Sequence, residues 1–325
     1  MKERLMRWAS GDRQVRLGRV GGLLSRVLRG VFLFCMCFVV LYPILYMVSV
    51  SLRTTEDLFD PTIIWIPKTF TLVNYTEVID LIGYVDLLRN SVFIALVSTL
   101  LNVTVCAMVG YGFARFRFRL RNLAFALVLF TIIVPPQNIS IPLYMQYKDF
   151  DFIGIGSLIG LFTGQPVTVN LLNTPLTMFV PAALGIGLRS GLFIYIFRQF
   201  FRGIPRELDD AAYIDGCSVP GTFLKIMVPN ASAAFVSCFL FSFVWYWNDF
   251  YQMSMYFNEP VTVTTALGML EDTLRGAGMN AWANPYIVVT RMQAACVLTI
   301  LPMLLLYIGL QRFFRESIER TGIVG

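Results

Sequence analysis

The sequence predicts an all-α polytopic membrane protein with six transmembrane helices. Of its 325 residues, 57% are hydrophobic and only 14% are charged, and the mean hydropathy is +0.67. Soluble domains carry about 25% charged residues, so this composition excludes an ordinary soluble fold. A helix needs about 20 apolar residues to cross a bilayer, and six stretches of the chain meet that requirement.

The six apolar stretches divide the chain into one membrane domain with a polar segment at each end. They cover approximately residues 31–52, 90–113, 123–144, 176–201, 231–257 and 288–313. Residues 1–30 are then a basic cytoplasmic segment, 31–314 the transmembrane domain and 315–325 a cytoplasmic tail. The first stretch begins only near Val31 and lacks a small-residue cleavage site, so we expect an uncleaved span.

A further apolar segment, residues 152–172, is interrupted by glycines and a proline. Lysine and arginine in short loops mark the cytoplasmic side of a membrane protein. With six spans and the N-terminus inside, nineteen basic residues are cytoplasmic, six are external, and Arg189 lies within a span. A seventh crossing would move Arg198, Arg202, Arg206 and Lys225 outside. We therefore interpret this segment as interfacial or re-entrant. The net charge of +6 reflects the topology of the chain, and we expect no nucleic-acid partner.

The residue types needed for ATP hydrolysis and for common enzymatic sites are missing from the sequence. There is no histidine, which removes the usual zinc ligand and the Ser-His-Asp triad. A phosphate-binding loop places lysine after glycine, and no lysine in this chain follows one. We expect this chain to have no ATPase site, no metal site and no cofactor of its own.

Few ionisable residues fall inside the predicted spans, where charges are costly and often functional. Asp249 lies in the fifth span, Arg189 in the fourth, and Arg291 near the outer end of the sixth. Arg291 can instead extend to the interface, and Arg189 can pair with a neighbouring helix in a structural role. A secondary transporter that couples through such groups remains an alternative.

The cytoplasmic loop between the fourth and fifth spans, residues 205–229, predicts a short helix, a turn and a second short helix. Pro205 and the acidic residues after it suit a first helical turn, because acids complement the positive end of the helix dipole. Gly216 suits a C-terminal cap, and Ser218 followed by Pro220 suits the start of the next helix. An ordinary amphipathic surface helix is the alternative interpretation.

The spacing within this loop resembles the EAA signature of ABC importer permeases. Asp210-Ala211-Ala212 is followed by Gly216, then by Ile226 and Val228-Pro229. Aspartate replaces the usual glutamate, and valine the usual leucine. The position of the loop, cytoplasmic and before the fifth span, is also that of the signature.

The resemblance covers the chain from about Gly30 to its C-terminus and is closest to the MalG-like branch of carbohydrate importer permeases. Short motifs carry it at residues 70–75, 111–116, 134–137, 141–144, 198–201, 245–249, 311–314 and 321–325. It implies a type I ABC importer permease fold, with the loop acting as a cytoplasmic coupling helix. The ATPase-coupling residues that it implies are Glu207, Asp210, Ala211, Ala212 and Gly216.

The resemblance also implies the partners and the location of the chain. A MalF-like second permease, two ATP-binding cassette subunits that bind ATP and Mg, and an extracellular solute-binding protein would complete the importer. The complex would lie in the bacterial cytoplasmic membrane. Together with the charge bias, this places both termini of the chain in the cytoplasm.

Aromatic faces and hydrogen-bonding side chains hold sugars in proteins, and the fifth and third spans are richest in them. The residues that we expect to line a substrate path are Trp245, Trp247, Asn248, Asp249, Gln137, Asn138 and Tyr144. An aromatic belt at the membrane interface is the alternative. We expect Asp249 to face a polar cavity or to pair with a cation, since a buried unpartnered carboxylate is costly.

The predicted function is therefore the permease subunit of an ABC importer for a sugar or an oligosaccharide. A permease for a polyol, glycerol phosphate or peptide is the first alternative, and a secondary transporter or a structural membrane scaffold is the next. The sequence leaves open the identity and length of the sugar and whether this subunit touches it. It also leaves open the role of residues 152–172 and whether the permease pair is hetero- or homodimeric.

Overall fold

The computed structural model describes residues 2–151, 154–165, 167–277 and 285–322. Every regular element in these ranges is a helix, which confirms the predicted all-α class. Two isolated antiparallel bridges join Arg53 to Phe70 and Phe150 to Val169. Residue 1 of the predicted N-terminal segment, residues 323–325 of the predicted C-terminal tail and residues 278–284 of the predicted external loop lie outside the described residues.

The helices differ widely in length. The longer ones are α1 (Lys2–Ser51), α3 (Tyr84–Arg115), α4 (Arg121–Ile133), α8 (Ser190–Gly203), α12 (Ser232–Trp247) and α16 (Pro285–Gly322). The shorter ones are η1 (Glu56–Leu58), α2 (Val73–Ile82), η2 (Pro136–Ile139), α5 (Ser140–Lys148), α6 (Ile155–Thr163), α7 (Leu176–Ala183), α9 (Glu207–Ile214), α10 (Val219–Thr222), η4 (Phe223–Met227), α11 (Val228–Asn230), α13 (Tyr251–Tyr256), α14 (Val263–Gly268) and α15 (Leu270–Gly276).

Three helices of the described chain are long and apolar enough to cross a membrane, at Ser25–Ser51, Tyr84–Arg115 and Pro285–Gln311. The number rises to five if two bent pairs each form one span. One pair bends by 101° between α4 and α5, where Pro135 and Pro136 interrupt the helix. The other bends by 81° at the start of α12. Six continuous spans are thus not confirmed, because the predicted stretch 176–201 is split between α7 and α8.

The chain divides into two compact units, of which the first comprises residues 1–75 and 283–297. A buried arginine, Arg53, organises the loop that follows α1. Its guanidinium donates hydrogen bonds to Ser49 Oγ at 2.9 Å, to the Ile64 carbonyl at 2.7 Å and to the Ile63 carbonyl at 3.1 Å. Asn74 donates to the Arg53 carbonyl at 2.8 Å. These bonds hold the loop against the end of α1.

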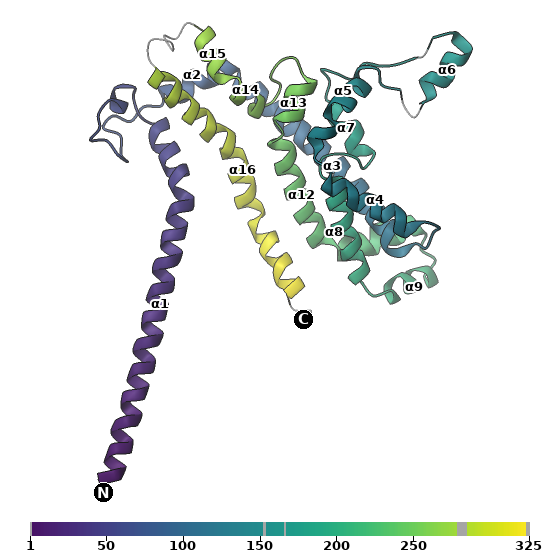
Figure 1. Cartoon of the computed structure of the whole chain (residues 1–325). Coiled ribbons are helices and arrows are strands. Elements are labelled where there is room, and N and C mark those ends of the chain that lie inside the picture. The colour runs from purple at the N-terminus through teal and green to yellow at the C-terminus, as the bar shows by residue number, and fades with distance from the viewer. Residues whose placement is uncertain (1, 152–153, 166, 278–284, 323–325) are drawn as a thin grey trace. The chain divides into compact units, whose positions relative to one another are not determined.

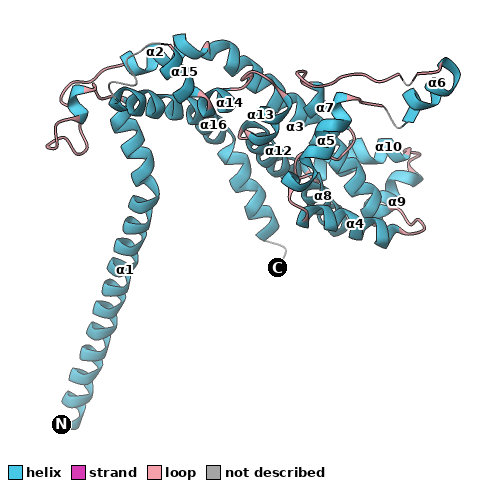
Figure 2. Ribbon diagram, turned by 45° about the horizontal axis from the view of Figure 1, so that its top comes forward, coloured by secondary structure: helices cyan, strands magenta, loops and turns pink. Residues whose placement is uncertain are grey.

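The second unit comprises residues 76–282 and 298–325, and α3 is its central helix. It packs against α7, α8, α12 and α14, as Figures 1 and 2 show for the first three. The contact between α3 and α8 is buried, and Phe193, Phe197 and Phe201 of α8 are fully buried in this core. Gly110 permits this approach, since a Cβ atom there would lie 2.7 Å from the Cβ of Phe197.

Residues 152–172 form an excursion from the second unit, with α6 at its tip (Figure 1). Backbone hydrogen bonds of 3.0 Å in both directions between Phe150 and Val169 close the base of the excursion. Leu161 and Phe162 of α6 are 82% and 87% exposed. Residues 152, 153 and 166 lie outside the described chain, and an interfacial or re-entrant role for the segment stays a prediction.

Candidate functional site: a short helix pair and a cavity beside an interrupted helix

Residues 205–229 form the helix, turn and helix that the sequence predicts. α9 begins at Glu207 and carries three acidic residues in its first turn. Gly216 follows with φ +79°, the left-handed conformation that glycine adopts most readily. Ser218 then caps α10, because its Oγ accepts a hydrogen bond from the Gly221 amide at 3.3 Å. Local chemistry is thus sufficient to explain both helix boundaries.

The two faces of α9 have different surroundings. Glu207, Asp210 and Ala211 are exposed, and Gly216 is exposed in the turn. Ala212, in contrast, is only 2% exposed and packs against the rest of the chain. Four of the five predicted coupling residues therefore lie where a partner can reach them, whereas Ala212 lies on the inner face.

The inner face of α9 is held by an ion pair that the sequence analysis did not single out. Asp209 Oδ2 lies 2.9 Å from Nε of Arg115, the last residue of α3, and the two side chains are 9% and 7% exposed. Arg115 also donates a 2.8 Å hydrogen bond to the Ile204 carbonyl, just after α8. Arg115 therefore connects α3, the end of α8 and α9.

Burial is the main influence on the charge of Asp209. Removal of water raises the pKa of Asp209 above its ordinary value, and the nearby Asp210 carboxylate raises it further. The Arg115 guanidinium opposes both effects. The available sequence signal was the spacing, since Asp209 and Ala212 are three residues apart and so share a helix face.

The fourth predicted span is broken at residues 184–189, and buried polar side chains hold the break. Asn102 of α3 donates to the Leu188 carbonyl at 3.1 Å and accepts from Ser190 Oγ at 2.6 Å. The Leu188 amide donates to Tyr246 Oη at 3.2 Å. Backbone groups freed inside a membrane span must find such partners. Immediately after Leu188, Arg189 adopts a left-handed φ of +56°.

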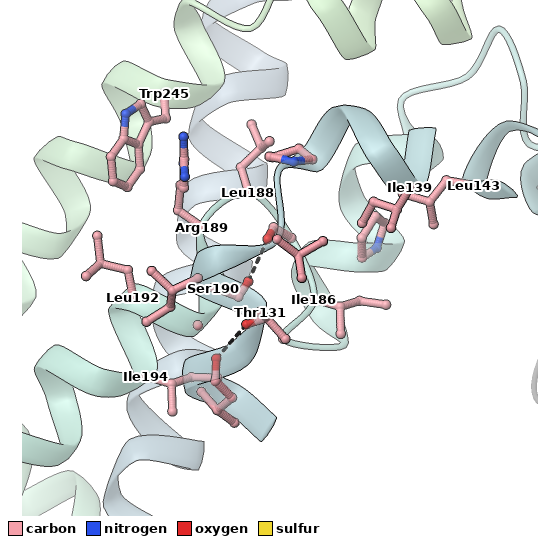
Figure 3. A pocket seen from close by; sticks show the side chains of 18 of the residues that line it. Thr131, Ile139, Leu143, Ile186, Leu188, Arg189, Ser190, Leu192, Ile194 and Trp245 are labelled. Atoms are coloured by element: carbon pink, nitrogen blue, oxygen red, sulfur yellow. Dashed lines mark hydrogen bonds between the residues drawn. The ribbon is translucent and has the colours of Figure 1, made fainter. Parts of the chain in front are cut away.

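A cavity of about 670 Å³ opens beside this break. Its walls come from α4, η2, α5, α7, the break itself, α8, α12 and α13. Figure 3 shows Arg189 and Trp245 facing one another at its edge, and the guanidinium carbon lies 5.7 Å from the centroid of the Trp245 ring. Apolar side chains such as Ile139, Leu143 and Ile186 make most of the lining.

Seven residues are predicted to line a substrate path. One of them, Trp245, lines this cavity. Trp247 is buried, and its indole donates to the Thr299 carbonyl at 3.3 Å. Tyr144 is half-buried and packs against the same core as Trp247. Gln137 and Asn138 are exposed in η2, at the bend between α4 and α5.

The other two predicted path residues, Asn248 and Asp249, follow the end of α12. Asn248 is exposed and donates to the Val244 carbonyl at 2.9 Å. Asp249 Oδ1 accepts from the Gln252 amide, in the first turn of α13, at 3.2 Å. Its Oδ2 is buried and meets no hydrogen-bonding group of the described residues. The cation that we expected as one possible partner of Asp249 is not seen there.

The residues around the break and the helix pair fall within a region that matches a known family. Residues 102–320 match the model of the binding-protein-dependent transport system inner membrane component family, which is more than half of the chain. The chain belongs to this family. The helical membrane permease that composition and the loop motif predicted is thereby confirmed, and its coarse role is transport.

Relatives with named functions support the same family membership. The arabinooligosaccharides transport system permease protein AraQ of Halalkalibacterium halodurans is 28% identical, over 89% of this chain and 92% of that protein. The lactose transport system permease protein LacG of Rhizobium radiobacter is also 28% identical, over 86% of this chain and 90% of that protein.

A solved structure shares the fold of this permease. It is the crystal structure of a bacterial ABC transporter involved in the import of the acidic polysaccharide alginate. One of its chains aligns with a TM-score of 0.67 over 91% of this chain and 97% of its own length, at 20% identity. The likeness shows that this chain shares the fold of that transporter chain over most of its length.

Proposed function

We propose that this chain is a permease subunit of a type I ABC importer for a sugar or an oligosaccharide. The open face of α9, with its acids and Ala211, carries the proposal, because it is an exposed surface attached to α3 through Arg115. The sugar class rests on relatives whose names specify arabinooligosaccharides and lactose. An extracellular binding protein would deliver the substrate.

The coupling mechanism follows from the two faces of α9. Glu207 and Asp210 would contact an ATPase subunit, Ala211 would allow close approach, and Gly216 would provide the turn. Ala212 would serve the same function from inside, by seating α9 on the permease. When the ATPase dimer closes on ATP and Mg, the displaced α9 would pull on α3 and α8 through the Asp209–Arg115 pair.

The full arrangement in the membrane is part of the same proposal. Each bent or interrupted helix pair would count as one span, which makes six with α1, α3 and α16. The basic residues near 1–30 and 115–121 would lie in the cytoplasm of a bacterium, as would both termini. A MalF-like second permease would complete the pathway, and this chain would bind no cofactor itself.

The test is ATP-driven uptake by the complete importer in proteoliposomes, with a panel of sugars, polyols and peptides. The double variant Glu207→Gln with Asp210→Asn should lower both ATPase co-purification and uptake, whereas Asp215→Asn, an exposed acid beyond the helix end, should not. Charge-assisted contacts are worth about 1.5–3 kcal/mol each, so we expect ATPase co-purification and uptake to fall tenfold or more. Uptake that continues without ATPase subunits would establish a secondary transporter instead.

A further inference from the structure

Arg189 occupies an unusual position for a charged residue. It lies at the break of the fourth predicted span and is exposed to the cavity. Within the described chain, the contact found for its guanidinium is the ring of Trp245, at 5.7 Å, and no ion pair reaches it. A charge at membrane depth needs water, a partner or a ligand. The packing around Arg189 does not supply a partner for its charge, so the cavity beside it needs an explanation.

Hydrogen bonds to its two neighbours in sequence fix the backbone position of Arg189. A left-handed backbone is unfavourable for a residue with a side chain and persists only where its surroundings enforce it. Here the residues on both sides are fastened: Leu188 by Asn102 and Tyr246, and Ser190 by Asn102. The bonds orient the side chain of Arg189 toward the cavity edge (Figure 3).

The charge of the cavity favours an anionic occupant. Among the described residues that line it, Arg189 is the charged one, and no acidic side chain accompanies it. Thr131 and Gln252 add uncharged hydrogen-bonding groups to the wall. Asp249, although it contacts the backbone of Gln252, is not part of the lining. The cavity therefore offers one fixed positive charge within largely apolar walls.

We propose that Arg189 and Trp245 form a subsite, within this subunit, for a sugar ring that carries a carboxylate. The proposal rests on the sugar importer function proposed above. A guanidinium binds a carboxylate through two parallel hydrogen bonds, and an indole offers a flat apolar surface with a polar edge. The volume of about 670 Å³ accommodates a ring of this size, since ligand pockets span about 300–1,000 Å³.

The experiment compares neutral oligosaccharides with uronic-acid oligosaccharides of the same length. The complete importer is reconstituted with its second permease, ATPase subunits and binding protein, and ATP-driven uptake of each sugar is measured. Arg189→Gln should lower uptake of the uronic-acid sugars by about 10- to 100-fold, the equivalent of one charge-assisted contact. Uptake of neutral sugars and basal ATPase activity should change little.

Three further variants define the subsite. Arg189→Lys should retain part of the uronic-acid uptake, because it keeps the charge but loses the planar fork. Trp245→Ala should lower uptake, whereas Trp245→Phe, which keeps a flat ring, should lower it less. Arg117→Gln, an exposed arginine of the loop after α3, is the matched control and should behave as the unmodified importer.

The outcomes separate the subsite from the general function. Uptake of neutral sugars alone, or uronic-acid uptake that Arg189→Gln leaves unchanged, would overturn the subsite and leave the sugar importer intact. Loss of the second permease from purified Arg189→Gln complexes would also overturn it, by showing that Arg189 pairs across the subunit interface. ATP-driven uptake of neither kind of sugar would instead contradict the proposed function itself.

Discussion

Arg115 contacts three segments that lie about 90 to 110 residues further along the chain. Its guanidinium reaches Asp209 at 2.9 Å and the Ile204 carbonyl at 2.8 Å, and it lies 3.9 Å from Met227 Sδ in η4. Since the Asp209 pair is almost fully buried, neither charge can turn to water when α9 moves. In the proposed coupling step, a displacement of α9 would therefore move the ends of α3 and α8 as well.

Removal of either partner of this pair should destabilise the permease. Arg115→Gln or Asp209→Asn leaves one buried charge without a counterion, which typically costs about 3–5 kcal/mol. The double variant Arg115→Met with Asp209→Leu should lose less stability than the sum of the losses in the two single variants. Thermal unfolding of the purified subunit in detergent measures these differences, with Arg117→Gln as a control. Strictly additive losses would show that the two residues are not coupled.

Gly110 and Gly112 provide a matched pair within α3. A Cβ at position 110 would lie 3.0 Å from the Arg198 amide nitrogen, besides its 2.7 Å contact with Phe197, so α3 and α8 would have to separate. At position 112 the nearest atom, on Phe116, is 3.9 Å away. Gly110→Ala should cost about 1–3 kcal/mol of stability, whereas Gly112→Ala should be neutral or slightly stabilising. Equal melting temperatures for the two variants would contradict the close helix contact.

At the scale of elements, α9 is a short helix whose two sides carry different tasks. Its inner side, with Asp209 and Ala212, is packed on the permease, and its outer side remains open. Ile214, at the end of the helix, is 86% exposed, and Leu208 on the same helix is 40% exposed, so apolar side chains lie on the open side of α9. This exposure agrees with an outer side that a partner covers.

The two adjacent alanines should respond differently to the same enlargement. Ala212→Leu overpacks a buried site and should lower the free energy of unfolding of the isolated permease by about 1–3 kcal/mol, with a lower melting temperature. Ala211→Leu should leave that stability unchanged and instead weaken binding to the ATPase subunit. Unfolding of the subunit and co-purification of the ATPase measure the two effects separately. A loss of ATPase binding in neither variant would place the docking surface elsewhere.

At the scale of the whole molecule, the number of crossings determines on which side each loop lies. In a variant that keeps Cys217 and lacks the other five cysteines, an impermeant thiol reagent should label the protein only from the cytoplasmic side. In a cysteine-free background, Ser157→Cys in α6 should be labelled only from the outside. Labelling of both positions from the same side would contradict six spans and support a different number of crossings.

The helical class and the family follow from features that are local in the chain. Long apolar runs must form helices in a bilayer, because lipid offers no partners for backbone groups. The spacing of Asp210, Ala211, Ala212 and Gly216 identifies the loop at residues 205–229, and capping residues set the boundaries of its helices. These properties depend on neighbours a few residues apart, so the sequence alone was sufficient to predict them.

Only the tertiary structure decided which side of each helix is buried and where the spans break. Asp209 turns inward because Arg115, far away in sequence, lies opposite it. Trp247 belongs to the core whereas Trp245 faces the cavity, although both are tryptophans of one helix. Arg189 is exposed because Asn102 and Tyr246 hold the break in the span. Burial and hydrogen-bond partners depend on contacts between distant segments, which a pattern of neighbouring residues does not contain.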